Sequence, residues 1–248
     1  MIRLLLAAIF VLLYFILGLP VLGILWIWKK RNPKAADLAS LRIVQWAFKV
    51  ILFLAGAKVT VVGEENVPKD QTVLYVANHQ GLFDILLTYS RCPNLTGFVS
   101  KDSIEKIPIL RIWMRRLYCL FLNRDDVREG LKTILVGIEQ MKSGISMFIF
   151  PEGTRNKEPE GELLPFKEGS FKLALKSGCP VIPVAITNSY KIFETQMPLL
   201  RRTHVVVQYG KPIILEELDA NTKKHLGEHA REMITDMLKD NQQYLNQN

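Results

Sequence analysis

His79 and Asp84 stand five residues apart in the segment NHQGLFD (residues 78–84), directly after an uncharged run that ends at Ala77. On a regular helix this spacing separates two side chains by about 140°, so they can meet only if His79 lies in a loop and Asp84 in the first helical turn. An aspartate on one imidazole nitrogen fixes the tautomer and leaves the other nitrogen free to accept a proton. The pair predicts a general base; the alternative is a buried histidine satisfied by a neighbouring acid.

A second segment, FPEGTRN (residues 150–156), also follows an apolar run of the kind found in buried strands. Arg155 could bind a phosphate through its forked guanidinium, and Glu152 could accept hydrogen bonds from a polyol hydroxyl. Lys101 and Arg124 each follow a short apolar run and could line the same anionic pocket. These residues predict a site for a phosphorylated molecule; the alternative is an ordinary turn with solvated surface charges.

Four segments, NHQGLFD, FLNR (121–124), FPEGTRN and VIPV (181–184), occur in this order and at this spacing. Together they resemble the four motif blocks of the glycerophospholipid acyltransferase family. The likeness covers about residues 58–215 and is closest to the bacterial branch that acts on 1-acylglycerol 3-phosphate (lysophosphatidate). The sequence departs from the family pattern at Arg111, where a glycine is common, and at residues 102–103, where Asp-Ser replaces Glu-Leu.

The resemblance implies roles for individual residues. His79 would be the catalytic base and Asp84 the residue that orients it. Pro183, in the fourth block, would belong to the region of the acyl donor. The acceptor and its phosphate would lie among a further group, which comprises Lys101, Arg124, Glu152, Gly153, Thr154 and Arg155.

The activity implied by the resemblance is transfer of a fatty acyl group from acyl-coenzyme A or an acyl-carrier protein to the free hydroxyl of 1-acylglycerol 3-phosphate, which forms phosphatidic acid. No metal and no cofactor beyond this co-substrate is implied. Two alternatives stay open: an acyltransferase for another lysolipid acceptor, and a non-catalytic protein that binds anionic lipid at a membrane. The net charge of +8 fits any anionic partner, but the positive charge collects beside apolar helices and no nucleic-acid reader motif is present.

One competing motif is HLGEH (residues 225–229), which matches a zinc-protease pattern with two histidines on one helix face. Gly227 weakens that helix, and the surrounding segment is strongly charged. The segment therefore predicts a solvated terminal helix and no metal site. The three cysteines have no C-x-x-C spacing, which argues against a disulfide framework and a four-cysteine zinc site.

The N-terminal segment is the most apolar part of the chain. Leu4 to Trp28 is free of charge, and as a helix it would be about 37 Å long, enough to cross a bilayer core of roughly 30 Å. The basic residues of segment 29–34 follow it at once, and the positive-inside rule then predicts a cell-membrane protein with the rest of the chain on the cytoplasmic side. Residues 41–54 predict an amphipathic helix, either in the lipid headgroup layer or packed on the domain core.

The remaining chain alternates between strand and helix patterns. We expect a division into a membrane-associated two-helix segment, 1–57, and an α/β domain, 58–248. The fold class is α/β, with a mostly buried mixed sheet flanked by helices. The proline in VIPV predicts an edge strand or a bulge at that strand. A composition of 49% hydrophobic and 23% charged residues argues against intrinsic disorder. The expected strands are 58–63, 72–77, 96–100, 119–122, 146–150, 181–187 and 204–209, and the expected helices are 84–89, 109–117, 127–142, 171–176 and 221–241.

Overall fold

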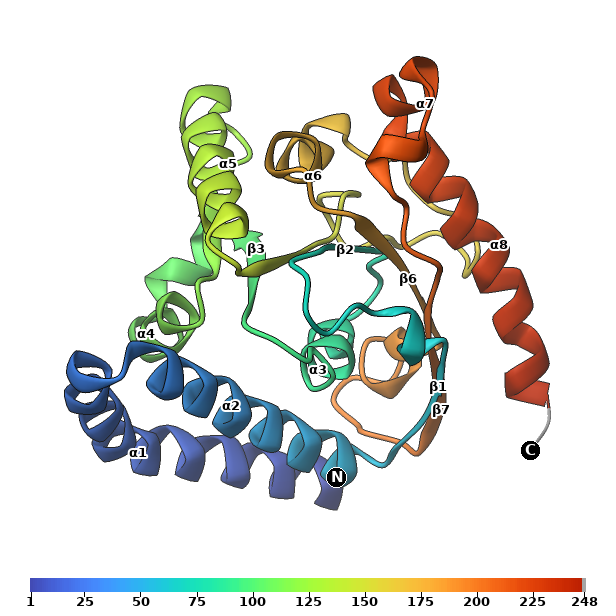
Figure 1. Ribbon diagram of the computed structural model, residues 1–248. Helices are drawn as coiled ribbons and strands as arrows, with labels where there is room; N and C mark the ends of the chain where they lie inside the picture. Colours follow the sequence, from blue (N-terminus) through green and yellow to red (C-terminus); the bar gives the residue numbers. More distant parts are fainter. Residues whose placement is uncertain (247–248) are drawn as a thin grey trace.

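The computed structural model describes residues 1–246 and contains a seven-stranded sheet with helices on both faces (Figure 1). The strands are β1 (Ala57–Val62), β2 (Leu74–Ala77), β3 (Thr96–Lys101), β4 (Leu120–Leu122), β5 (Ser146–Ile149), β6 (Val181–Thr187) and β7 (Thr203–Tyr209). The α-helices are α1 (Ile2–Arg31), α2 (Pro33–Ala55), α3 (Phe83–Tyr89), α4 (Pro108–Arg116), α5 (Val127–Lys142), α6 (Lys172–Ser177), α7 (Ala220–Lys224) and α8 (Leu226–Asn246). The predicted fold class is confirmed.

The strand order is β1-β7-β6-β2-β5-β3-β4. The strands from β6 to β4 run parallel to one another, β7 runs antiparallel to β6, and β1 runs parallel to β7. Every residue of β2, β5 and β6 is buried. Their near-continuous apolar sequences follow from this placement, because strands covered on both faces have no side that must meet water.

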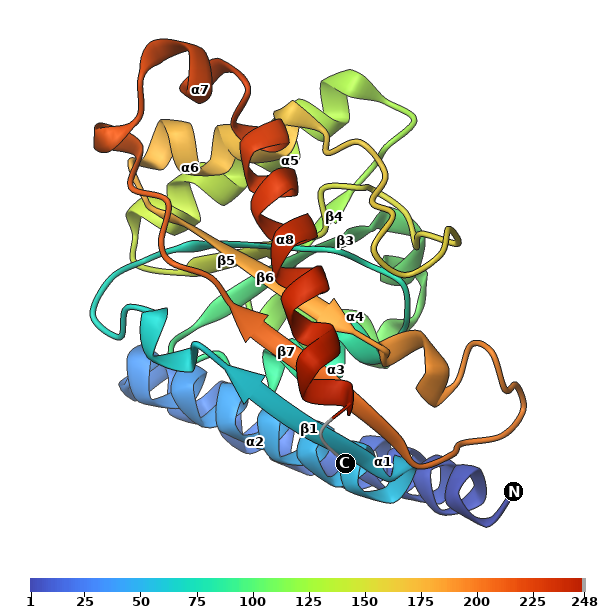
Figure 2. The same ribbon diagram turned by 90° about the vertical axis from the view of Figure 1, so that its right-hand side faces the viewer.

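Alternate residues of each strand point to opposite faces, so the sheet separates two apolar cores. Tyr75 and Phe148 belong to the core beneath α1–α4, whereas Leu74 and Met147 belong to the core beneath α5, α6 and α8. Figure 1 shows the α1–α2 hairpin along one side of the sheet and α5, α6 and α8 on the other. Figure 2 shows α8 crossing the face formed by β6 and β7, which it contacts.

The terminal helix differs from its prediction in its start and in its continuity. The terminal helix was expected to begin at Asn221, but Asp219 is the cap, accepting backbone hydrogen bonds from Asn221 and Thr222. The helix is also interrupted at His225, whose φ and ψ of −114° and 39° separate α7 from α8. An aspartate that satisfies the exposed N–H groups of a first turn is a strong start signal, and it lies two residues before the expected one.

Pro183 was expected at an edge or a bulge, and the edge alternative is wrong because β6 lies between β7 and β2. The Gly210 N–H donates to the Pro183 carbonyl at 2.8 Å, and Val181 exchanges two hydrogen bonds with Ile213. Between these contacts the facing chain advances three residues (210 to 213) while β6 retreats two (183 to 181). The proline therefore lies beside a bulge, the other alternative predicted for it.

The first two helices form a hairpin whose turn is set by Asn32 and Pro33. The Asn32 side chain accepts a hydrogen bond from Ala35 N–H, and Pro33 takes the first helical position, where its missing N–H has no consequence. Large apolar side chains of α1 are exposed along its length, including Leu5, Leu12 and Leu17. Both helices are long and apolar enough to cross a membrane by length and composition.

The second helix, α2, packs between α1 and the sheet. Leu41, Val44 and Leu52 are buried in the sheet-side core, so α2 packs on the domain as one of the two alternatives predicted. Trp46 and Phe53 of the same helix are 57% and 81% exposed. The hairpin therefore joins the apolar core of the α/β part to an exposed apolar face.

A buried carboxylate fastens the hairpin to α4 and the chain that follows it. Asp37 is 2% exposed; the Lys29 ammonium lies 2.9 Å from one of its oxygens, and the Tyr118 hydroxyl donates to the other. Beside it, Arg116 donates to the Ser40 hydroxyl and to a backbone carbonyl of α1. The Asp37 carboxylate can be buried there because each of its oxygens has a partner.

Replacement of Asp37 by asparagine should loosen this attachment. The neutral amide keeps the shape but cannot accept from both partners as a carboxylate does, and we expect a loss of about 1–3 kcal/mol of unfolding free energy. Thermal denaturation in detergent measures it. Asp236→Asn is the matched control, because Asp236 and its partner Lys239 are 73% and 70% exposed and such pairs contribute less than about 1 kcal/mol. Equal effects of the two substitutions would contradict the role of Asp37.

Candidate active site

The two segments singled out in the sequence meet at one edge of the sheet. Residues 78–84 follow β2 and residues 150–156 follow β5, and these two strands are parallel neighbours. Because parallel strands end at the same edge, their following loops lie together, as functional sites in open α/β sheets commonly do. Asn78 fixes the start of the first loop: its side chain donates to the Ile186 carbonyl and accepts from the Ile186 N–H of β6.

His79 and Asp84 are in contact. His79 Nδ1 lies 2.7 Å from Asp84 Oδ2, with His79 in the loop before α3 and Asp84 in the first turn of that helix. The predicted geometry of the pair is thereby confirmed, while its catalytic role stays a prediction. The Asp84 side chain is 1% exposed and that of His79 is 13% exposed, so the carboxylate is enclosed and the ring reaches the surface of the site.

Asp84 also shapes the loop that carries the histidine. Its Oδ2 accepts hydrogen bonds from the backbone N–H groups of Gln80 and Gly81, both at 2.8 Å. The same oxygen therefore holds the imidazole and two orphan donors at the start of α3. A carboxylate in this position is further favoured by the positive end of the helix dipole.

The imidazole is packed on one side and open at its other nitrogen. Its ring stacks on Phe150 with centroids 4.1 Å apart and planes 15° from parallel. Within residues 1–246, Nε2 makes no hydrogen bond, whereas Nδ1 is held by Asp84. A ring fixed in this way can accept a proton at Nε2 and return it, which is the requirement for general acid–base chemistry.

Glu152 joins the two loops. One carboxylate oxygen accepts from the His79 backbone N–H at 2.8 Å, and the other accepts from Leu164 N–H at 3.1 Å. The Asn156 N–H donates to the His79 carbonyl at 2.7 Å, so the backbone of His79 is held on both sides. In this structure Glu152 is 4% exposed and bonds the chain itself, which gives it a positioning role.

The surroundings of Glu152 shift the pKa of its carboxyl. Burial raises the pKa of this carboxyl above its ordinary value of 4.5, and the hydrogen bonds from the His79 and Leu164 backbone act in the opposite direction. The raised pKa records that desolvation of the carboxylate outweighs the two hydrogen bonds that stabilise it.

Cationic side chains surround the Gly153 turn. Arg124 donates to the Gly153 carbonyl, and a Cβ built on Gly153 would lie only 2.7 Å from the Lys167 ammonium. Gly153 has φ of +75°, so this position favours glycine both for its backbone and for its close neighbour. Lys101 pairs in register with Leu122 of β4, which places it near the start of the Arg124 segment.

Arg155 points toward an acid from a distant segment. Its Nη1 lies 4.0 Å from Glu194 Oε1, and half of its side chain is exposed. Glu194 Oε1 also accepts from the Leu82 N–H at 2.6 Å, at the start of α3. Its buried Oε2 has no partner within the described chain. Glu194 thus contacts both the histidine loop and the arginine loop.

Thr154 and Pro183, two further predicted site residues, lie in different surroundings. Thr154 lies in the same turn as Gly153 and is exposed. Pro183 lies buried within β6, and a Cβ on Gly210 would come within 2.8 Å of its ring, so it is enclosed by the sheet and not brought to the His79 loop. Among the described residues, no group of three or more His, Cys, Asp or Glu side chains is placed to hold a metal ion.

Sequence reasoning did not single out Phe150 as the ring partner, Lys167 or Glu194. Phe150 stands at the head of the FPEGTRN segment, so its position was available although its stacking was not. Lys167 and Glu194 carry no spacing signal: Lys167 returns to Gly153 through a loop, and Glu194 approaches Leu82 from 112 residues along the chain.

An apolar cavity of about 390 Å³ adjoins the histidine loop. Leu82 and Phe83, next to the loop, line one part of it, and Phe98 and Ser100 of β3 line another. Side chains of α1, α2 and α4 complete the wall, among them Trp113. A cavity of this composition accepts a hydrocarbon chain rather than a polar ligand.

Comparison with known proteins identifies relatives of this arrangement. Residues 58–187 match the model of a protein family described as Acyltransferase. The chain is 31% identical over 204 residues to a 1-acyl-sn-glycerol-3-phosphate acyltransferase of Saccharomyces cerevisiae, an alignment that covers 80% of this chain and 67% of that protein. It is also 31% identical over 195 residues to the enzyme of the same name from Borreliella burgdorferi, covering 77% of this chain and 73% of that protein.

A solved structure matches nearly the whole chain. The crystal structure of the 1-acyl-sn-glycerophosphate (LPA) acyltransferase PlsC from Thermotoga maritima superposes with a TM-score of 0.77 at 27% sequence identity. The match covers 96% of this chain and 94% of that one, so it includes the α1–α2 hairpin as well as the sheet.

Removal of the imidazole tests the site directly. We expect His79→Ala to lower the rate of acyl transfer by about 10²–10⁴, the usual contribution of a positioned acid–base group, and to leave the fold intact. His225→Ala is the matched control, an exposed histidine at the break between α7 and α8. Normal turnover of folded His79→Ala protein, measured beside its thermal denaturation, would exclude the proton-transfer role.

Glu152→Gln tests the link between the loops through its pH dependence. Because burial raises the pKa of Glu152, the folded protein binds a proton there at higher pH than the unfolded chain does. The stability contributed by this carboxyl therefore falls as the pH rises from 4.5 through the raised value, and the glutamine variant lacks this slope. The free energy of unfolding of the wild type minus that of the variant should therefore decrease over that interval, as followed by thermal denaturation at several pH values. An increase of this difference with pH would contradict a raised pKa of Glu152.

Proposed function

The chain belongs to the acyltransferase family, and we propose that it transfers a fatty acyl group from an acyl thioester to the free hydroxyl of 1-acylglycerol 3-phosphate, forming phosphatidic acid. One observation carries the proposal most directly: the contact between His79 and Asp84 at 2.7 Å, next to a turn surrounded by cations. A polarised imidazole has no purpose in anion binding alone, but it is what activation of a hydroxyl requires.

The proposed reaction is a direct transfer. The acceptor hydroxyl gives its proton to Nε2 of His79, while its oxygen attacks the thioester carbonyl. The carbon–sulfur bond then breaks, the acyl ester forms, and the leaving thiolate takes the proton back from Nε2. Asp84 stabilises the imidazolium that exists between these steps, as an aspartate does in other acid–base sites. These steps require no metal and no organic cofactor beyond acyl-coenzyme A or an acyl-carrier protein.

The acceptor phosphate is proposed to lie at the Gly153 turn. Arg124, Arg155 and Lys167 bring positive charge to this turn, and Lys101 follows in the neighbouring strand, in register with Leu122. An arginine fork suits a phosphate because it donates two parallel hydrogen bonds, and an ammonium adds a point charge. Thr154 adds an exposed hydroxyl in the same turn.

The apolar cavity supports an acyl chain beside the catalytic loop. Its wall begins at Leu82 and Phe83, three and four residues after His79, and extends under α1 and α2. A hydrocarbon chain with its thioester or ester at His79 would bury its tail there. Burial of each methylene contributes about 0.8 kcal/mol, so a chain that enters the cavity gains most of its binding free energy from this wall.

The exposed apolar helices associate the enzyme with a membrane, and their packing favours a position in one leaflet. At one end of α1, Arg3 lies beside Gly56 and Arg202; near the other end, the Leu25 carbonyl accepts from Arg116 of α4. A helix about 45 Å long that is attached at both ends to the α/β part cannot stand upright in a bilayer without drawing that part into lipid. We infer that the hairpin lies along the membrane surface, with the catalytic part on the cytoplasmic side of the cell membrane.

Two alternatives differ from this proposal in the acceptor or in the absence of catalysis. A different lysolipid acceptor uses the same catalytic pair and the same cavity, and a non-catalytic lipid-binding protein uses neither. Thiol release from acyl-coenzyme A or acyl-carrier protein on adding a panel of lysolipids to the purified protein in detergent separates all three. We expect release with 1-acylglycerol 3-phosphate. Release only with another lysolipid identifies the second alternative, and no release with any acceptor or donor rejects the enzymatic proposal.

Arg155→Ala should weaken binding of the phosphorylated acceptor more than it slows the reaction. We expect KM for 1-acylglycerol 3-phosphate to rise about tenfold or more, since hydrogen bonds to charged groups contribute about 1.5–3 kcal/mol. Steady-state kinetics with this acceptor, at saturating acyl donor, measure the change.

Glu194→Gln is a control of opposite sign for the same site. It removes the negative charge that Arg155 faces but retains an oxygen for the Leu82 N–H. The arginine is then free for the phosphate, and KM should fall. If neither substitution changes KM, Arg155 does not bind the phosphate.

A further inference from the structure

Three arginines from two distant segments gather at the end of the α1–α2 hairpin that carries the N-terminus. Arg3 lies in the first turn of α1, and Arg201 and Arg202 directly precede β7. A Cβ built on Gly56 would lie within 3.1 Å of both the Arg3 guanidinium and the Arg202 side chain, so these two arginines meet over the chain that joins α2 to β1. Figures 1 and 2 show the start of β7 beside α1 near its N-terminal end. We call these three residues the arginine cluster.

The arginine cluster has no acid to neutralise it. Within residues 1–246 none of its members forms an ion pair, and Arg3 donates one hydrogen bond, to the Ala55 carbonyl. The stretches of chain that meet here, 1–36, 38–63 and 195–215, contain no aspartate or glutamate. Arginine side chains that meet without an acid repel one another, and an anion bound between them would remove that repulsion.

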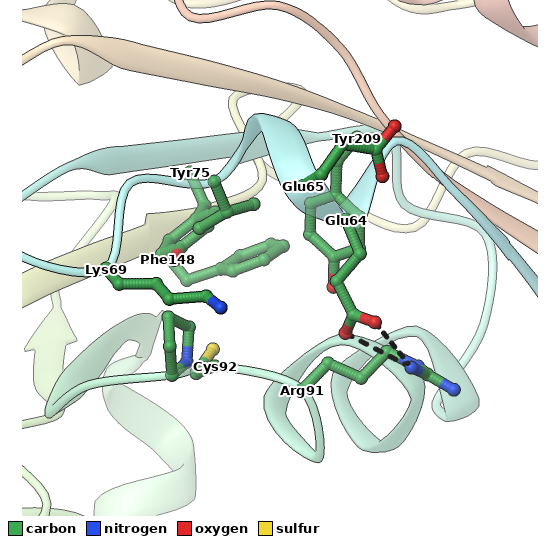
Figure 3. Close-up of a pocket in the computed structure, with 10 residues that line it drawn as sticks. Glu64, Glu65, Lys69, Tyr75, Arg91, Cys92, Phe148 and Tyr209 are labelled. Carbon is green, nitrogen blue, oxygen red and sulfur yellow. Dashed lines mark hydrogen bonds and ion pairs between the residues drawn. The ribbon is translucent and has the colours of Figure 1, made fainter.

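The acids that border these stretches lie at other places in the fold. Asp37 is buried near the opposite end of the hairpin. Glu64 and Glu65 follow the far end of β1, where Glu64 pairs with Arg91 (Figure 3). The Glu194 carboxylate is directed to the loop before α3, where it accepts a backbone hydrogen bond. None of these four carboxylates is in contact with the arginine cluster.

Exposed apolar side chains lie next to the arginine cluster. They are Ile2 and Leu5 of α1, Phe53 in the last turn of α2, and Met197 in the loop that leads to β7. Both arginines of that loop are exposed as well. Basic side chains at the margin of an apolar surface match the boundary between lipid tails and phosphate headgroups. The surface is also continuous with the exposed apolar face of the hairpin.

We propose that the arginine cluster binds the anionic headgroups of membrane lipids and attaches the chain before β7 to the bilayer surface. The inference rests on the proposed position of the hairpin along a membrane, and it does not depend on acyl transfer. Each basic side chain near an anionic bilayer strengthens binding about fivefold, so three give up to about a hundredfold. A nucleic acid would leave the apolar side chains in water, whereas a bilayer covers them together with the arginines.

The proposed attachment is linked to the catalytic loop through a short piece of chain. Arg201 follows Glu194 by seven residues, which span no more than about 25 Å. Glu194 accepts from the Leu82 N–H and faces Arg155. One end of this piece of chain is therefore held at the lipid headgroups and the other at the proposed site of the acceptor phosphate.

Binding to vesicles of two compositions tests the proposal. The full chain in detergent is diluted into preformed vesicles of phosphatidylcholine, either alone or with about 30 mol% phosphatidylglycerol, and flotation measures the partition coefficient. We expect the anionic vesicles to bind at least about tenfold more strongly at about 0.1 M salt. Most of this preference should disappear at about 1 M salt, because the Debye length falls from about 10 Å to about 3 Å.

Replacement of the whole arginine cluster assigns the preference to it. The variant that combines Arg3→Gln, Arg201→Gln and Arg202→Gln should lose at least about fivefold of the preference for anionic vesicles. Its binding to phosphatidylcholine alone should stay unchanged, because the apolar face of the hairpin is intact. Arg201→Glu, a single change at an exposed position outside any helix or strand, should shift the preference in the same direction.

The matched control removes the same charge from exposed side chains of α5 and α6, on the opposite face of the sheet. It combines Arg128→Gln, Lys172→Gln and Lys176→Gln and should bind as the wild type does. Thermal denaturation in detergent checks the fold of each variant without reference to activity. The proposal is overturned if the wild type binds both vesicles equally, if the cluster variant and Arg201→Glu keep the full preference, or if the control loses as much.

Discussion

The Asp84 carboxylate is the interaction on which the rest of the site depends. A single oxygen of this side chain accepts from two backbone N–H groups and contacts the His79 ring. Because the carboxylate is enclosed at the start of α3, it cannot exchange these partners for water without exposing the helix start. The loop bend and the orientation of the imidazole are therefore consequences of one buried charge.

The second loop is held to the first by the same kind of interaction. Glu152 accepts from the backbone on each side of the site, and Asn156 returns a hydrogen bond to His79. The raised pKa of Glu152 shows that enclosing this carboxylate is unfavourable for its charged form. The fold retains it because its two oxygens satisfy backbone donors of two separate loops, which a neutral side chain of the same size cannot do.

One face of the sheet carries all the features that relate to lipid. The His79 loop, the apolar cavity and the α1–α2 hairpin lie on it together, and side chains of both hairpin helices line the cavity. A row of contacting rings lies on this face: Phe148 and Phe150 are 5.3 Å apart between centroids and tilted by 53°, and His79 stacks on Phe150 at 4.1 Å. The opposite face, beneath α5, α6 and α8, is an ordinary packed core.

The sequence by itself predicted the fold class, the contact between His79 and Asp84 and most of the elements, although not the break at His225 between α7 and α8. Short-range patterns suffice there: apolar runs mark buried strands, and a histidine five residues before an aspartate can reach it across one bend. It did not determine that β6 lies inside the sheet, that Glu152 bonds the backbone, or that Glu194 and Lys167 reach the site. Those facts depend on which distant segments become neighbours, as Glu194 does for Leu82 across more than a hundred residues. Only the packing of the whole chain decides such contacts, because no local spacing encodes them.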